Sequence, residues 1–394
     1  MTAVRRTGLA VVLGLAAAGC ARSFLSLGPA PDDGAGVPVV ASVFLVGDAG
    51  SVQPGDRILA ELIRQGKRAP RTSTVVYLGD NVYPRGIPPR TDPGYPEAER
   101  RLFRQAAVAD STGLPLLFLP GNHDWDRQGP DGWAQIQREA ALLGDYAARR
   151  QVRIRLAPAG GCPGPEVVPV VPGLRLVAID TQWWLHQDPR PGRAPEEYLS
   201  RLPDRSVRCG AETEQAFVEA LTAVNHDGAG GVSLVVGHHP LESHGEHGGY
   251  HPWPQWLFPL VPTPLAGWAW APIGWIYPLG RRLVSHPQDL NGAANRAMRA
   301  AIEGTFAPGS PLVYASGHDH SLEVIRRGAR FLLVSGSGSE HHQSAVGRGD
   351  STAYSASRPG FMRLDLMADE RVRVAVTVLS GAGRIEEGFR AWLK

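Results

Sequence analysis

The sequence predicts an α/β fold with layered sheets. Short apolar runs recur along the chain, each followed by a glycine-containing motif, and amphipathic helical patterns separate them. Continuous apolar runs of this length are typical of strands buried on both faces. The expected strands are 42–46, 74–78, 115–119, 174–179, 232–236 and 312–315. The expected helices are about 55–66, 96–107, 132–150, 211–225 and 291–304. A second, hairpin-rich sheet is expected from runs near 321–326, 330–335, 360–366 and 372–378.

The composition fits a globular protein. Of the 394 residues, 43% are hydrophobic and 20% are charged, which allows a sizeable core. The 47 glycines and 34 prolines indicate many turns and long loops rather than a helical bundle. The net charge is only +2, and the 40 Lys and Arg residues are scattered along the chain. We therefore expect no nucleic-acid partner.

The first 20 residues are predicted to be an export signal. Two arginines precede an apolar run that is too short to span a bilayer. The run ends in Ala17-Ala18-Gly19-Cys20, which resembles a bacterial lipobox except that alanine stands where leucine is usual. We expect a lipoprotein anchored through Cys20 in the periplasm or at the outer membrane. The alternative is an ordinary secretory signal in which Cys20 is incidental.

Two further segments are distinguished by their composition. Residues 21–40 are predicted to be a linker, followed by one catalytic domain over 41–394. At about 252–280 this domain carries an insertion whose prolines exclude a regular membrane-spanning helix. The insertion could rest on a lipid surface, cover the active site, or pack on the core as an extended loop. Five of the ten tryptophans fall there: Trp253, Trp256, Trp268, Trp270 and Trp275.

Beyond Cys20, the only cysteines are Cys162 and Cys209. Two remaining cysteines in an exported protein often pair, and both lie in turn-rich surroundings. We expect a disulfide between them; the alternative is two separate thiols.

Polar side chains follow five of the expected strands. In each case an apolar strand runs into glycine and then into Asp, Asn or His. Ligands in layered α/β folds gather beyond the carboxyl ends of strands, so the five motifs are expected to converge. The motifs are Val46-Gly47-Asp48-Ala49-Gly50, Leu78-Gly79-Asp80-Asn81-Val82-Tyr83, Pro120-Gly121-Asn122-His123-Asp124, Val236-Gly237-His238-His239-Pro240 and Ser316-Gly317-His318-Asp319-His320.

These residue types are those of a metal site. Carboxylate, amide oxygen and imidazole suit iron, zinc or manganese, and the motifs contain no thiolate for a softer metal. Two such ions about 3.5–4 Å apart can hold a hydroxide and clamp a phosphoryl group. Asp80, in the central motif, is the natural bridging carboxylate. Each motif alone is compatible with a turn or cap, but five of them after five strands favour a metal site.

The ordered motifs resemble those of the calcineurin-like metallophosphoesterase superfamily, and Tyr83, three residues after Asp80, resembles its purple acid phosphatase branch. The resemblance covers about residues 43–324. It implies a four-layer α/β/β/α metallophosphoesterase sandwich with two metal ions at the strand ends. The ferric ion would be bound by Asp48, Asp80, Tyr83 and His320. The divalent iron, zinc or manganese ion would be bound by Asp80, Asn122, His238 and His318.

The resemblance also implies substrate-contacting histidines. His123 matches the family histidine that contacts the phosphate and helps to protonate the leaving group, and Asp124 is expected to orient its other ring nitrogen. His247 follows His238 by nine residues, which is the spacing of a second substrate histidine in small acid phosphatases. The catalytic candidates are therefore His123, Asp124 and His247.

The other histidines are expected at the periphery. Supporting or surface positions are expected for His239 and His244. Solvated positions are expected for His186 and His286. The loop before His341 and His342 could approach the cleft, but we expect both residues on the surface.

The function expected from these residues is hydrolysis of phosphomonoesters by a hydroxide held between the two metals. The insertion directly follows His247, so the substrate could instead be a phosphodiester or a lipid-linked phosphate at a membrane surface, reached through the lipid on Cys20 and the Trp-rich loop. A third reading is a non-catalytic surface protein that binds a partner through its tryptophans. Such a protein would not need the metal ligands or His123.

Overall fold

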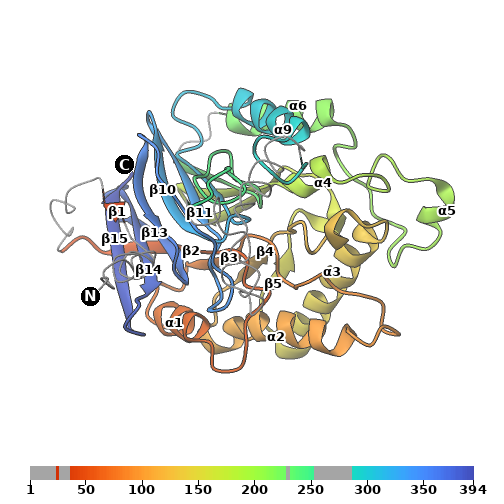
Figure 1. The fold of residues 1–394 in the computed structure, drawn as a ribbon, viewed down its shortest axis with the longest axis horizontal. Helices are drawn as coiled ribbons and strands as arrows, with labels where there is room; N and C mark the ends of the chain where they lie inside the picture. Colours follow the sequence, from red (N-terminus) through yellow and green to blue (C-terminus); the bar gives the residue numbers. More distant parts are fainter. Residues whose placement is uncertain (1–23, 26–35, 228–230, 253–285) are drawn as a thin grey trace, which may run out of the picture.

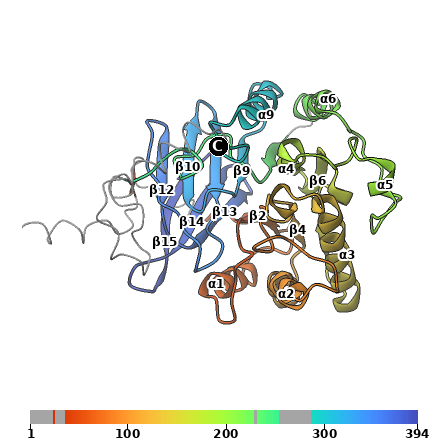
Figure 2. The ribbon, with the colours of Figure 1, turned by 45° about the vertical axis from the view of Figure 1, so that its right-hand side comes forward.

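The structure is a computed structural model and describes residues 24–25, 36–227, 231–252 and 286–394. Two mixed β-sheets pack face to face, with helices on the outer side of each sheet (Figure 1). One sheet is covered by α1 (Arg57–Gly66), α2 (Tyr95–Thr112) and α3 (Gly132–Arg150). The other is covered by α6 (Glu214–Asn225) and α9 (Ala293–Gly304) (Figure 2). The expected α/β/β/α sandwich is therefore confirmed.

The seven-stranded sheet has the order β15-β14-β13-β2-β3-β4-β5. Its first four strands in sequence are mutually parallel, and its last three add antiparallel strands beside β2. The strands are β2 (Val39–Val46), β3 (Thr74–Tyr77), β4 (Leu116–Phe118), β5 (Ile154–Leu156), β13 (Gly360–Met367), β14 (Val372–Leu379) and β15 (Ile385–Trp392).

The eight-stranded sheet has the order β1-β12-β10-β11-β9-β8-β7-β6. Its four central strands, β11, β9, β8 and β7, are parallel to one another, and antiparallel strands flank them on both sides. The strands are β1 (Phe24–Leu25), β6 (Glu166–Val171), β7 (Leu174–Ala178), β8 (Val232–Val236), β9 (Val313–Ser316), β10 (Leu322–Arg327), β11 (Arg330–Ser335) and β12 (Thr352–Ala356).

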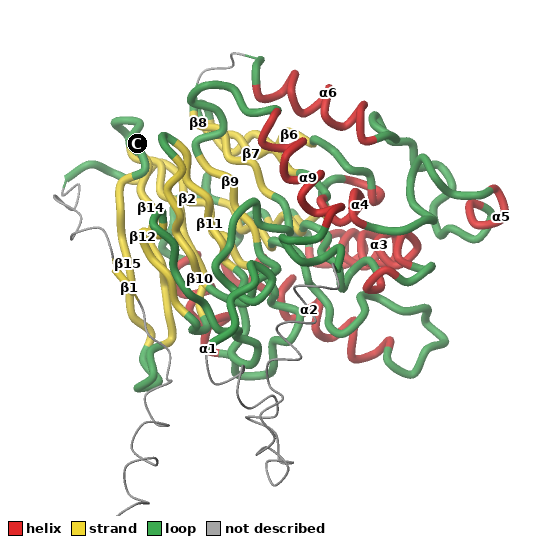
Figure 3. Tube along the Cα trace, turned by 45° about the horizontal axis from the view of Figure 1, so that its top comes forward, coloured by secondary structure: helices red, strands yellow, loops and turns green. Residues whose placement is uncertain are grey.

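The two sheets hold the core between them because successive side chains of a strand point to opposite faces. In β2, Val43 and Leu45 pack against the opposing sheet, whereas Phe44 packs among the helices α1 to α3. In β8, Leu234 points inward and Val235 packs against α6 and α9. The expected apolar runs are thus strands buried on both faces, and Figure 3 shows α6 and α9 on one side of the sheets and α1 to α3 on the other.

The later strands do not form a separate sheet, and that expectation was wrong. β10 and β11 join the sheet of β7 to β9, and β13 to β15 extend the sheet of β2 to β5. The physical reason is that pairing partners are distant in sequence: β11 pairs with β9, and β13 pairs with β2. An apolar pattern identifies a strand without identifying its neighbour.

Several expected segments lie partly or wholly outside the described residues. The export signal over 1–20 and the five tryptophans of the insertion are among them. Within the expected linker, Phe24–Leu25 forms β1 and pairs with β12, and β2 already begins at Val39. No helix in the described part of the chain is long and apolar enough to cross a membrane.

A disulfide joins Cys162 to Cys209, as expected. It connects the turn that precedes β6 to the segment before α6, and two short helices, α4 (Thr181–Leu185) and α5 (Glu196–Leu199), lie between the two cysteines. The disulfide therefore closes a long covalent loop that includes the edge strand β6 of the eight-stranded sheet.

Removing this disulfide should destabilise the fold without changing it. The two cysteines are 47 residues apart, so a double Cys162→Ser/Cys209→Ser variant is expected to lower the free energy of unfolding by about 2–4 kcal/mol through loop entropy. Urea unfolding of the oxidised protein and the variant measures this difference. Equal unfolding midpoints, or free thiols in the untreated protein, would contradict the expectation.

Candidate metal centre

The loops at the carboxyl ends of five strands meet where the two sheets face each other. Asp48 follows β2 and its backbone N–H donates to the Gly79 carbonyl, beyond β3, at 3.0 Å. The carboxylate of Asp48 accepts a hydrogen bond from the backbone N–H of His318, which follows β9, at 2.9 Å. The N–H of Gly317 donates to the His238 carbonyl, beyond β8. The expected convergence of the motifs is confirmed.

Three of these side chains stand on a left-handed backbone. The φ angles are 58° at Asp48, 55° at Asp80 and 69° at His318. This conformation is uncommon for residues other than glycine, and it persists where surrounding contacts determine it. Here those contacts are the hydrogen bonds between loops, so each side chain is held in position by a neighbouring strand end.

Glycines before the ligands allow the loops to approach closely. A Cβ atom on Gly79 would lie 2.6 Å from Nδ1 of His238, and one on Gly121 would lie 2.3 Å from the backbone nitrogen of Asp80. Both distances are too short for any side chain. Glycine at these positions is therefore a requirement of the convergence.

The first group of candidate ligands surrounds the phenol of Tyr83. Its Oη lies 3.1 Å from Asp48 Oδ1, from Asp80 Oδ2 and from His320 Nε2. His320 Nε2 in turn lies 3.2 Å from Asp48 Oδ1. Burial, and then the two carboxylates, raise the pKa of Tyr83 well above its ordinary value, so the phenol keeps its proton in the absence of a cation.

The second group surrounds the amide oxygen of Asn122. Asn122 Oδ1 lies 3.0 Å from His238 Nε2 and 3.0 Å from His318 Nδ1. Asp80 Oδ1 lies 3.4 Å from His238 Nε2, so Asp80 presents one oxygen to each group. Burial alone would raise the pKa of Asp80, but His238 and His123 outweigh it and lower the pKa to about 2. Asp80 is therefore a carboxylate.

The tautomers of two histidines make this second group a candidate cation site. His238 Nδ1 lies 2.8 Å from the Leu78 carbonyl and His318 Nε2 lies 2.9 Å from the Gln288 carbonyl, so both of these nitrogens carry the proton. When both rings are neutral, as in a metal site, the opposite nitrogens present lone pairs to each other and to the amide oxygen of Asn122. Acceptors that converge in this way repel one another unless a positive charge, either a proton or a metal ion, lies among them, so the arrangement suits a metal ion.

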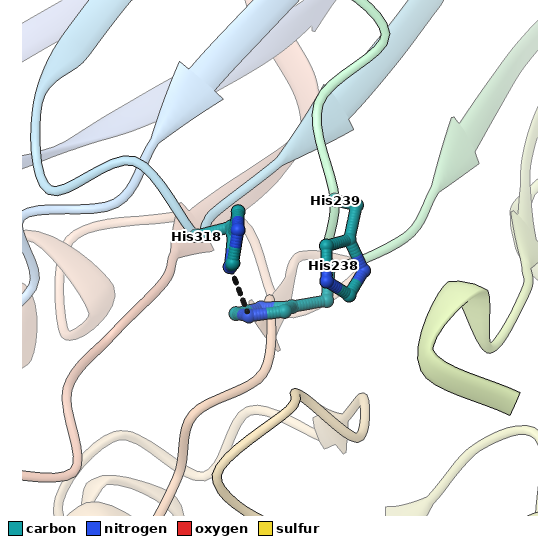
Figure 4. A group of neighbouring side chains, drawn as sticks. All are labelled: His238, His239 and His318. Carbon is teal, nitrogen blue, oxygen red and sulfur yellow. Dashed lines mark hydrogen bonds between the residues drawn. The ribbon is translucent and has the colours of Figure 1, made fainter. Parts of the chain in front are cut away.

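His239 lies in the same cluster, but both of its ring nitrogens make hydrogen bonds to residues outside it. Its Nδ1 lies 2.8 Å from Thr181 Oγ1 and its Nε2 lies 2.6 Å from Gln288 Oε1. Figure 4 shows its ring beside His238 and His318, which are joined by a contact of 3.3 Å between their facing nitrogens. Because both its ring nitrogens are occupied, His239 supports the ligands rather than adding to them.

His123 lies beside the first group, but Asp124 does not orient it, and that expectation was wrong. The ring of His123 packs edge-on against Tyr83, and its Nδ1 lies 2.7 Å from the Pro84 carbonyl. The carboxylate of Asp124 instead accepts from the backbone N–H groups of Asn81, Val82 and Gly121. Asp124 therefore ties the loop of Asn122 to the loop of Asp80.

His247 lies beside the second group. Its ring centroid is 4.0 Å from that of His318, and its Nδ1 lies 2.9 Å from Asp289 Oδ1. His244 points elsewhere, toward Glu323 at 3.0 Å. Asp289 was not found from the sequence, because it lies 42 residues after His247, beyond the Trp-rich insertion.

Two peripheral histidines were misplaced from the sequence. His342 packs against Tyr83 and His320 with ring centroids 5.0 and 3.9 Å apart, whereas its neighbour His341 is exposed. The run Leu-Val-Ser-Gly at the end of β11 repeats the strand-then-glycine pattern of the other motifs and could have indicated this. His186 is buried against Trp125 rather than solvated, and burial lowers its pKa to about 4, whereas His286 is exposed as expected.

Comparison with known proteins assigns the family. The profile of the calcineurin-like phosphoesterases matches residues 42–261. Since the match spans more than half of the chain, the protein belongs to this family, the metallophosphoesterases. No curated protein matched the sequence.

Solved structures give three further similarities. GAP50, the anchor in the inner membrane complex of Plasmodium, is 15% identical with a TM-score of 0.48, over 89% of each chain. Purple acid phosphatase PPD1 from yellow lupin seeds is 14% identical with a TM-score of 0.46, over 89% of this chain and 53% of that one. Zinc-bound Vps29 from Entamoeba histolytica is 10% identical with a TM-score of 0.31, over 90% and 99%.

A buried acid behind the candidate ligands is expected to make stability depend on pH. Glu139 of α3 accepts from the Asn81 side chain at 3.0 Å, and burial, its largest cause, raises its pKa from 4.5 to about 8. Because the pKa of Glu139 is higher in the folded protein than its ordinary value of 4.5, its contribution to stability is fully present below pH 4.5. This contribution is lost as the pH rises through about 8.

Glu139→Gln should therefore weaken this pH dependence, because glutamine stays neutral. Urea unfolding of the metal-free protein between about pH 5 and pH 9 should show the wild type losing stability relative to the variant. Glu219→Gln, at an exposed position of α6, is the matched control and should follow the wild type. Parallel curves for the wild type and Glu139→Gln would contradict the interpretation.

Proposed function

We propose that the protein is an exported phosphomonoesterase of the purple acid phosphatase type with two metal ions. The observation that carries the proposal is that two groups of candidate metal ligands share Asp80. One group surrounds the phenol of Tyr83, and the other surrounds the amide oxygen of Asn122. A ferric ion would be held by Asp48, Asp80, Tyr83 and His320. A divalent iron, zinc or manganese ion would be held by Asp80, Asn122, His238 and His318. When bound, such a pair neutralises phosphoryl oxygens and lowers the pKa of water toward neutrality.

The chain's own residues would bind and orient the phosphate ester. His123 is fixed by its backbone N–H, which donates to Asp80 Oδ1 at 2.9 Å, and by the contact of Nδ1 with Pro84. Its Nε2 then faces Asp80 at 3.8 Å, beside the first group. His247 occupies the corresponding place beside the second group. A phosphate between the two groups would meet an imidazole from each side.

A membrane-associated substrate is the second candidate. The Trp-rich insertion is flanked on both sides by residues of the site: His247 precedes it, and the Gln288 carbonyl contacts His318 after it. With an anchor at Cys20, the protein would work near a lipid surface, where phosphodiesters or lipid-linked phosphates are available. A non-catalytic binding role is disfavoured by the converging acceptors, which serve no purpose in a binding surface.

A substrate panel distinguishes these functions. The metal-loaded protein should hydrolyse p-nitrophenyl phosphate faster than bis-p-nitrophenyl phosphate or phosphatidic acid in vesicles. Preference for the diester or for the lipid would overturn the monoesterase proposal, and a metal-loaded protein inactive on all three would favour a binding role.

Asn122→Ala should lose metal and more than about 100-fold of the activity, since removing even a residue that only orients a metal ligand lowers activity by about 10–100-fold. Gln215→Ala, exposed on α6, should change neither.

Iron at the first group has a spectroscopic consequence. A tyrosinate bound to ferric ion would colour the protein, with absorption in the green-yellow, whereas the metal-free protein should be colourless because a tyrosine side chain alone absorbs no visible light. Tyr83→Phe should retain the fold and lose the band when loaded with ferric ion. An iron-free, colourless and fully active wild type would contradict the assignment of Tyr83.

A further inference from the structure

His247 makes a hydrogen bond to a buried carboxylate from beyond the Trp-rich insertion. Asp289 Oδ1 lies 2.9 Å from His247 Nδ1, and the side chain of Asp289 is only 5% exposed, against 26% for His247. A carboxylate accepts, so Nδ1 of His247 carries the proton. The two nitrogens lie at different positions on the ring, so a phosphate group in the cleft must be met by Nε2.

The backbone of His247 is fixed independently of this hydrogen bond. Its N–H donates to Asp319 Oδ1 at 2.9 Å, and its carbonyl accepts from the N–H of Leu290 at 3.0 Å. Removing the Asp289 carboxylate would therefore leave the main chain of His247 in place. What it would release is rotation of the imidazole about its side-chain bonds.

The two substrate histidines are held by different acceptors. His123 Nδ1 contacts a neutral backbone carbonyl, that of Pro84, at 2.7 Å. His247 Nδ1 contacts a charged carboxylate, and hydrogen bonds with an ionised partner are roughly twice as strong as neutral ones. His247 is also the more exposed ring, with 26% of its side chain accessible against 18% for His123. The more exposed of the two rings is therefore the one that bonds to a carboxylate.

We propose that Asp289 is a positioning residue: it fixes the ring of His247 against His318 so that Nε2 meets the phosphate bound at the second metal group. The proposal rests on the proposed function, because His247 needs a phosphate to contact. It gives the chain an aspartate–histidine pair whose members come from the two sides of the Trp-rich insertion. In this role Asp289 acts through His247, to which it makes a hydrogen bond of 2.9 Å.

A double-mutant cycle tests the pairing. Asp289→Ala should lower kcat for p-nitrophenyl phosphate by roughly 10- to 100-fold, the range for residues that orient a functional histidine. KM should change less, because a misoriented contact weakens transition-state stabilisation more than substrate binding. In a His247→Ala background, Asp289→Ala should cause no further loss. Asp289→Asn keeps an acceptor oxygen and should recover part of the activity.

Controls separate orientation from a general structural role. Asp289→Ala should contain as much metal as the wild type, and Asp369→Ala, at an exposed hairpin, should keep full activity. If the losses from Asp289→Ala and His247→Ala multiply in the double variant, or if Asp289→Ala alone is fully active, the positioning role is wrong. Loss of metal in Asp289→Ala would likewise contradict it.

A binding measurement separates this inference from the proposed function. Inorganic phosphate is titrated into the metal-loaded wild type, Asp289→Ala and the double variant by calorimetry. The pairing is supported if Asp289→Ala weakens phosphate binding in the wild type but causes no further weakening in the His247→Ala background. This holds even if the wild type hydrolyses no ester, and in that case only the proposed function fails. An active wild type whose phosphate affinity and kcat are both insensitive to Asp289→Ala overturns the pairing alone.

Discussion

The structure depends most on a set of lone pairs that face one another. Backbone carbonyls of Leu78 and Gln288 fix protons of His238 and His318 on their outer nitrogens, so in the neutral rings the inner nitrogens turn their lone pairs toward the oxygen of Asn122. Buried acceptors without a donor are costly. Two positive charges beside Asp80 would turn this repulsion into binding, so the arrangement makes physical sense as a metal centre.

The fold holds the acceptors together by hydrogen bonds between strand ends. Asp48, Asp80 and His318 adopt left-handed backbone conformations that cost free energy. Bonds between the two sheets, such as that from His318 N–H to the Asp48 carboxylate, keep them there. Behind the candidate ligands, Asp124 also holds two loops together by accepting hydrogen bonds from three backbone N–H groups. The sandwich thus serves as a rigid frame, and its large core supplies the stability that offsets the strained loops.

Local signals in the sequence predicted most of the fold and the meeting of the seven candidate ligands at the strand ends, because each motif joins a buried strand to glycine and a polar residue. What could not be predicted depends on contacts distant in sequence. β13 pairs with β2, and Asp289 reaches His247 across the insertion. Asp124 was misassigned because its position next to His123 in the sequence does not determine where its side chain points. The side chains of His123 and Asp124 make hydrogen bonds to different parts of the backbone. His342 was missed because it does not directly follow the glycine at the end of its strand, as the polar residues of the other motifs do.

The central claim is that Asp80 lies between two cations. Anomalous X-ray diffraction from crystals of the metal-loaded protein tests it most directly. The account predicts two anomalous peaks about 3.5–4 Å apart, one among Asp48, Tyr83 and His320 and the other among Asn122, His238 and His318, with Asp80 touching both. A single peak, or peaks away from Asp80 in a protein that is active, would contradict it.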